Sequence, residues 1–149
     1  MSSEAIKRVE KAIEEVKRGK MVIMMDDEDR ENEGDLVYAA TFSTPDMVNF
    51  MAKEARGLIC TPVTKEIATK LDLVPMVSDN VSNYETAFTV SIDSANAETG
   101  ISAAERDDCI SKLSNPQTVS EDFVRPGHIF PLIAKDGGVL VRTGHTEGS

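Results

Sequence analysis

The chain has 149 residues, 40% of them hydrophobic, which is enough for one domain with a substantial core. Its 26 acidic residues outnumber its 16 basic ones, and the resulting net charge of −10 disfavours nonspecific nucleic-acid binding. No apolar run has membrane-spanning length, no secretory signal opens the sequence, and Cys60 and Cys109 form no CxxC pair. These features predict a single domain over residues 1–149 in a reduced, cytoplasmic protein that binds neither nucleic acid nor membranes.

The N-terminal segment predicts an amphipathic helix, because apolar residues recur at intervals of three and four. The helix is expected to begin at a cap on Ser2 or Ser3 and to end at Gly19. The apolar run at residues 21–25 predicts a buried strand, and residues 35–40 predict a strand that returns.

The middle of the chain continues this alternation of helices and strands. Thr44 stands before a proline, which predicts a helix start, and this helix should end at Gly57. Residues 58–63 predict a strand, and Thr64 is a plausible cap for the short helix after it. Residues 77–86 are polar and rich in turn-forming residues, which is typical of a loop.

The last third of the chain predicts further elements of both kinds. Residues 87–93 predict a strand, and Ser102 opens a capping box before a helix. Residues 128–134 and 139–142 flank a Gly-Gly pair, which predicts a hairpin. Some of the expected strands are joined through helices and others through hairpins. This mixture indicates an α+β fold, a three-layer α/β/α arrangement with a mixed, twisted sheet.

The most unusual segment is DDEDRENEGD at residues 26–35, which holds seven acids around Arg30. It could be a solvated charged loop, a cation site or a set of catalytic carboxylates. The ligand spacing of an EF-hand is absent. On an extended backbone Glu31, Glu33 and Asp35 would project from one face. That arrangement suits a hard cation, with one carboxylate left over to accept a proton.

A second candidate site is RTGHTE at residues 142–147. Arg142 offers a planar fork for an anion, Gly144 permits close backbone approach, and His145 is a possible base or ligand. With Thr146 at an expected helix start, this chemistry suits a phosphate. The alternative is an ordinary strand end with capping residues. His128 lies beside an apolar strand, and a lone histidine in that position is more often structural than catalytic.

Four segments occur in an order that resembles the 3,4-dihydroxy-2-butanone-4-phosphate synthases of riboflavin biosynthesis. They are DDEDRENEGD, TGISAAER, RPGHIFPL and GGVLVRTGHTE, and the resemblance covers nearly the whole chain from Met21 onward. It implies a lyase that converts D-ribulose 5-phosphate to 3,4-dihydroxy-2-butanone 4-phosphate and formate. The implied route is metal-stabilised enediolate formation, dehydration and skeletal rearrangement. The implied assembly is a homodimer with two Mg²⁺ (or Mn²⁺) ions per active site.

The resemblance also implies roles for individual residues. Glu31 and His145 match metal ligands, and His128, Glu33 and Asp35 match catalytic residues. The implied substrate-binding residues are Arg30, Glu31, Asp35, Arg142, Thr143, Gly144, His145 and Thr146. Glu98 departs from the family, which commonly has a threonine there, and family members continue past GHTE to an essential glutamate. The chain is therefore expected to be a C-terminally truncated domain, and the alternative function is a noncatalytic metal- or sugar-phosphate-binding module.

Overall fold

The strands form two separate sheets in the computed structural model, which describes residues 3–149. In the smaller sheet β1 (Val22–Met25) pairs antiparallel with β2 (Gly34–Val37). In the larger sheet β5 (Phe123–Ile133) lies between β3 (Cys60–Val63), to which it is parallel, and β4 (Ile92–Ser94), to which it is antiparallel. The predicted α+β fold with a mixed sheet is confirmed.

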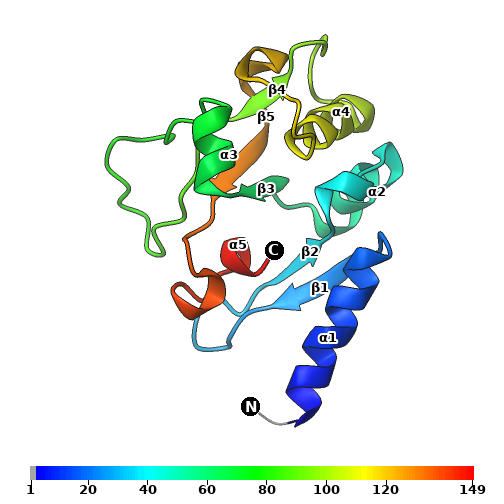
Figure 1. Cartoon of the computed structure of the whole chain (residues 1–149), viewed down its shortest axis with the longest axis vertical. Coiled ribbons are helices and arrows are strands. Elements are labelled where there is room, and N and C mark those ends of the chain that lie inside the picture. Colours follow the sequence, from blue (N-terminus) through cyan, green and yellow to red (C-terminus); the bar gives the residue numbers. More distant parts are fainter. Residues whose placement is uncertain (1–2) are drawn as a thin grey trace.

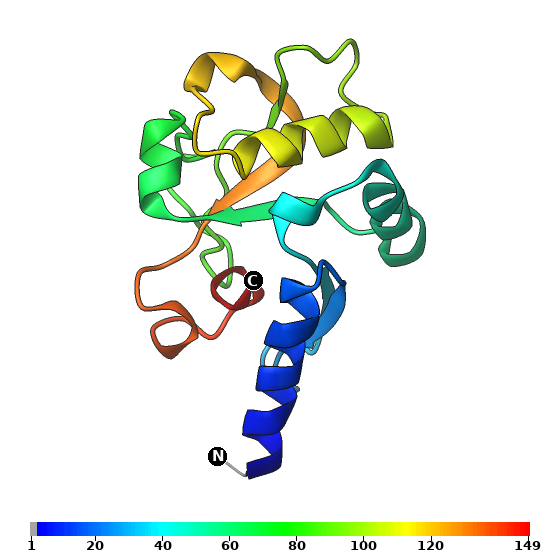
Figure 2. The same ribbon diagram turned by 45° about the vertical axis from the view of Figure 1, so that its right-hand side comes forward.

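The helices lie on both sides of the larger sheet. Figures 1 and 2 show α2 and α4 on one side of β5 and α3 on the other, while α1 runs along the smaller sheet. No helix among residues 3–149 is both long and apolar enough to cross a membrane. The bounds are α1 (Ser3–Lys17), α2 (Pro45–Phe50) with a π-helical turn (Met51–Ala55), α3 (Lys65–Lys70), α4 (Ala103–Leu113) and α5 (His145–Gly148).

The helix starts agree with the capping signals in the sequence. The Thr44 and Thr64 hydroxyls each accept a hydrogen bond from the N–H three residues on, at 3.2 and 3.3 Å. Ser102 and Glu105 form a reciprocal capping box at the start of α4. These bonds satisfy backbone donors that have no partner within the helix. The proposed cap at Ser2 lies outside the described residues.

The hydrophobic core lies between the larger sheet and its flanking helices. Its buried members are Val48, Ile59, Val63, Ala68, Leu71, Leu73, Ile92, Cys109, Ile110, Leu113, Phe123 and Ile129. Neither α1 nor β1 contributes a buried residue to it, and Ile23 on β1 is 69% exposed. The expected burial of strand 21–25 is therefore wrong, because the smaller sheet stands apart from the core.

The hairpin expected after residue 134 is also wrong. Gly137 and Gly138 have φ angles of 92° and 61°, and a 3-10 turn (Gly138–Leu140) follows instead of a strand. Both edges of β5 are already paired, with β3 and with β4, so no edge of β5 is open to residues 139–142. As a result, Arg142 follows a turn rather than a strand.

The segment before β4 is only partly regular. Residues 87–93 were expected to be a strand, but β4 begins at Ile92. Upstream, Phe88 and Thr89 make isolated bridges to Leu132 and Pro75. The loop at residues 77–86 contains no helix or strand, as its polar composition predicted.

Candidate metal site in the acidic loop

The acidic loop folds around the carboxylate of Asp26, the first residue after β1. Its oxygens accept hydrogen bonds from the backbone N–H groups of Glu31 (3.1 Å) and Glu33 (3.0 Å) and from Nη1 of Arg30 (2.8 Å). Burial alone would raise the pKa of Asp26. The hydrogen bonds from Glu33, Arg30 and Glu31 outweigh it and lower this pKa to about 2. Asp26 is therefore a fixed negative charge that shapes the loop.

Arg30 offsets part of the negative charge in this loop. Its Nη1 lies 2.9 Å from Oε2 of Glu31, and its guanidinium lies 4.8 Å from the centre of the Tyr84 ring. The Tyr84 hydroxyl donates a hydrogen bond to the Arg30 carbonyl at 3.0 Å. Burial acts to lower the pKa of Arg30, but Asp26 and Glu31 raise it overall. The carboxylates are thus held together by a shared arginine, and the loop at residues 77–86 is tied to them through Tyr84.

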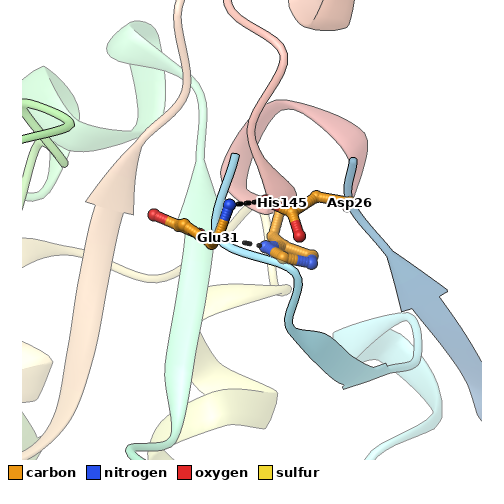
Figure 3. A group of neighbouring side chains, drawn as sticks. All are labelled: Asp26, Glu31 and His145. Carbon is orange, nitrogen blue, oxygen red and sulfur yellow. Dashed lines mark hydrogen bonds and ion pairs between the residues drawn. The ribbon is translucent and has the colours of Figure 1, made fainter. Parts of the chain in front are cut away.

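His145 completes a cluster with two of these carboxylates. Ligand atoms of Asp26, Glu31 and His145 lie within 4.8 Å of one another, where the acidic loop meets the start of α5 (Figure 3). Nδ1 of His145 lies 3.6 Å from Oε2 of Glu31 and 3.7 Å from Oδ2 of Asp35. Among the described residues its buried Nε2 has no hydrogen-bond partner.

This donor set fits a divalent cation. Carboxylate oxygens with one imidazole nitrogen suit ions such as Mn²⁺, and Mg²⁺ favours the oxygens. Asp26 already accepts three hydrogen bonds, whereas Glu31 is paired through a single oxygen. Of the two predicted ligands, Glu31 has more free lone pairs than Asp26, and His145 has a ring nitrogen, Nε2, with no partner among the described residues. The structure places them together, although the backbone that does so differs from the expected one.

The expectation that Glu31, Glu33 and Asp35 share one face is wrong. Residues 28–31 form a turn, and Asn32 has a φ of 52°, so the segment is not extended. Asp35 lies on β2 near His145, with its side chain half exposed. Glu33 is exposed, and its described bonds to Asp26 are made by its backbone N–H and carbonyl.

Of the residues predicted to bind phosphate, some line a cavity and one takes part in a buried ion pair. Nη1 of Arg142 lies 2.6 Å from Oε2 of Glu147, whose side chain is only 1% exposed. Nη2 of Arg142 donates to the Tyr84 carbonyl at 3.0 Å. Thr146 is buried. An open cavity of about 610 Å³ is lined by Met24, Met25, Asp26, Asp27, Asp29, Arg30, Val139, Thr143, Gly144 and His145.

His128 lies on a different part of the fold. It is on β5, and its Nδ1 lies 2.8 Å from Oδ2 of Asp93 on β4. No hydrogen bond or ion pair within residues 3–149 joins it to the acidic loop. The predicted metal ligands and the predicted catalytic histidine are therefore not brought into contact.

The two cysteines and Glu98 have structural surroundings. Burial, followed by the charge of Asp35, raises the pKa of Cys60 to about 11, and burial raises that of Cys109 to about 12. Both therefore remain thiols at neutral pH. The backbone N–H of Glu98 donates to the Glu105 carboxylate at 2.8 Å, which holds the TGIS segment against α4.

Comparison with known proteins shows the family of the chain. Residues 10–149 match the model of the 3,4-dihydroxy-2-butanone 4-phosphate synthase family. The chain belongs to this family. The 3,4-dihydroxy-2-butanone 4-phosphate synthase of Helicobacter hepaticus is 66% identical over 143 residues, which are 96% of this chain and 40% of that protein. Riboflavin biosynthesis protein RibBA of Bacillus velezensis is 60% identical over 141 residues, or 95% of this chain and 35% of that protein.

Solved structures of the family share the fold. A 3,4-dihydroxy-2-butanone 4-phosphate synthase in complex with two magnesium ions has a TM-score of 0.92 at 44% identity, and the match covers 94% of this chain and 66% of that one. A cation-free form has a TM-score of 0.86 at 43% identity, covering 94% and 65%. The chain thus spans well under half of the curated relatives and about two thirds of these solved synthase chains.

Sequence reasoning missed several residues that contact the predicted site residues. Asp26 was not singled out among the seven acids, although it directly follows a predicted strand and so begins the loop. Tyr84 and Asp93 lie far from their partners in sequence and carry no local motif, whereas Glu147 ends the RTGHTE segment and pairs with Arg142 five residues before it. Only the fold brings Tyr84 to Arg30 and Asp93 to His128.

Asp26 should make the stability of this synthase domain dependent on acid pH. Because its folded-state pKa of about 2 lies below the ordinary 3.8, its ionised form contributes stability above about pH 4. That contribution is lost as the pH falls from about 4 to about 2. We expect urea unfolding to show that the stability gap between wild type and Asp26→Asn narrows across this window. Parallel pH curves for the two proteins would contradict this assignment.

Proposed function

We propose that this chain carries the metal-binding part of an active site that converts D-ribulose 5-phosphate to 3,4-dihydroxy-2-butanone 4-phosphate and formate. The observation that carries the proposal is the approach of Glu31 to His145, beside Asp26, in a member of this family. A similar synthase has been solved in complex with two magnesium ions, which supports a dinuclear site here as well.

Glu31 and His145 would hold the metal, Mg²⁺ or Mn²⁺, with two ions per site. When bound, the metal supplies a Lewis acid that polarises the hydroxyl and carbonyl oxygens of the sugar. Asp35 is half exposed and lies 3.7 Å from His145, which lines the cavity, so it is the proposed acceptor of a proton from the bound substrate. Glu33 and His128 are the other proposed proton-transfer groups.

The phosphate of the substrate would bind near the start of α5. Thr143 and Gly144 line the cavity, and Arg30, which also lines it, supplies positive charge. Thr146, the next residue after His145 on α5, belongs to the same proposed phosphate-binding set. Arg142 is already held by Glu147, so a phosphate would compete with Tyr84 and Thr86 for its Nη2. Anchoring the phosphate in this way holds the sugar carbons beside Glu31 and His145.

The test is formate release from ribulose 5-phosphate by the protein encoded by the complete reading frame. We expect activity with Mg²⁺ or Mn²⁺, loss to background in excess EDTA, and recovery when the metal is restored. Full activity in EDTA would contradict the metal role. Binding of the sugar phosphate without formate release would support the noncatalytic module instead.

We also propose a homodimer in which His128 acts at the metal site of the other subunit. The support is that His128 is bound by Asp93 on β4 and has no described contact with the acidic loop. If so, Glu31→Gln and His128→Gln should each be inactive alone. Mixing them under conditions of subunit exchange should restore about a quarter of wild-type activity, since a statistical mixture contains heterodimers with one intact site. No recovery in a mixture shown to contain heterodimers would contradict the shared site.

A further inference from the structure

Asp93 binds His128 with both of its carboxylate oxygens. Oδ1 accepts a hydrogen bond from the His128 backbone N–H, and Oδ2 lies 2.8 Å from Nδ1 of the ring. The Asp93 side chain is 9% exposed, whereas that of His128 is 43% exposed. The buried carboxylate thus contacts one edge of an imidazole that is otherwise open to solvent.

The backbone around this pair leaves the carboxylate little freedom. A Cβ on Gly100 would lie 1.9 Å from Oδ2 of Asp93, and one on Gly127 would lie 2.0 Å from the backbone of Ile92. The β4–β5 pairing also shifts at this point, from Ile92 opposite Ile129 to Asp93 opposite Val124. The bulge carries His128, and the absence of a side chain at Gly100 and Gly127 lets the backbone approach Asp93 this closely.

The contact determines which ring nitrogen carries the proton. An ionised carboxylate can only accept hydrogen bonds, so Nδ1 must be the donor. Nε2 of the neutral ring then keeps its lone pair, and no group among residues 3–149 bonds to it. We propose that Asp93 is a positioning residue that holds His128 in the Nδ1-protonated tautomer, with Nε2 as its basic nitrogen.

This arrangement resembles the buried Asp–His pairs of hydrolases, in which the carboxylate orients the imidazole and selects its tautomer. A purely structural role for Asp93 is the competing explanation, because Oδ1 also binds the His128 backbone. Asp93→Asn separates the two. The introduced amide can keep the backbone bond through its oxygen, but its NH₂ group would donate to Nδ1 and so favour the opposite tautomer.

The experiment is two-bond ¹H–¹⁵N correlation of the imidazole rings in the complete ¹⁵N-labelled protein at pH 9. Residues 1–149 contribute two histidines, and the signals that disappear in His128→Gln are those of His128. In wild type we expect the His128 Nδ1 to be protonated and Nε2 to be bare. In Asp93→Asn we expect the reverse. A wild-type ring protonated at Nε2 alone would overturn the proposal, and this outcome does not require Asp93→Asn to fold.

The catalytic consequence rests on the proposed function and is measured separately. For Asp93→Asn we expect kcat for formate release to fall at least about 10-fold with KM changed less than about twofold. Asp108→Asn is the matched control, because it removes a nearby charge that pairs with Lys112 and not with His128. Equal activity in the two variants would overturn the positioning role. If wild type released no formate, the proposed function would fail while the tautomer result still stood.

Discussion

Glutamine in place of Glu31 should abolish formate release and most of the ligand-induced rise in the unfolding temperature. Glu31 contributes a carboxylate oxygen within reach of His145, and glutamine replaces it with a neutral, weaker ligand. At 100 times Kd, a ligand that binds only the folded state adds about 2.7 kcal/mol, or about 5–11 °C for a domain of this size. We expect wild type to show such a shift with Mg²⁺ and ribulose 5-phosphate.

Without ligand, Glu31→Gln should have nearly the stability of wild type. It loses a partly exposed pair with Arg30 but also removes one of several neighbouring negative charges. Glu28→Gln is the matched control, because Glu28 carries the same charge in the same loop and is exposed. The measurement is a thermal melt of all three proteins with and without both ligands. Equal ligand-induced shifts in wild type and Glu31→Gln would show that Glu31 is not a ligand.

Loss of Arg142 should produce the largest change in stability. Arg142→Met leaves the Glu147 carboxylate, only 1% exposed, without its cation, although the backbone N–H of Lys135 still donates to it at 3.0 Å. Removing one partner of a buried ion pair typically costs about 3–5 kcal/mol. We expect a decrease of this size in the free energy of unfolding, measured by urea denaturation.

The double variant Arg142→Met with Glu147→Leu should recover most of this loss, because it removes the buried charge as well. Arg142→Lys retains a positive charge but not the planar fork. It should therefore cost less stability than Arg142→Met, and by weakening contacts to the substrate phosphate it should raise KM for ribulose 5-phosphate. A fully stable Arg142→Met protein would show that Glu147 does not depend on this pair.

Local sequence signals correctly predicted the helices that begin at a clear capping residue. The caps at Thr44, Thr64 and Ser102 depend on a hydroxyl and a backbone N–H three residues apart, so they can be read without knowing the fold. The hairpin at residues 139–142 failed for the opposite reason. Its Gly-Gly signal and apolar run were genuine, but whether a strand forms depends on a free sheet edge, and β5 has none.

For the candidate site, too, the sequence determined some features and the tertiary structure determined others. By itself, the sequence determined the types of group and their family: an acidic loop with one arginine, and a histidine after a glycine in GHTE. The tertiary structure decided that Asp26, rather than Glu33, joins Glu31 and His145, because the turn at residues 28–31 directs the backbone N–H groups onto the Asp26 carboxylate. It also decided that Asp93 holds His128. The contacts to His145 and the contact between Asp93 and His128 join segments distant in the chain, and no spacing within one segment encodes them.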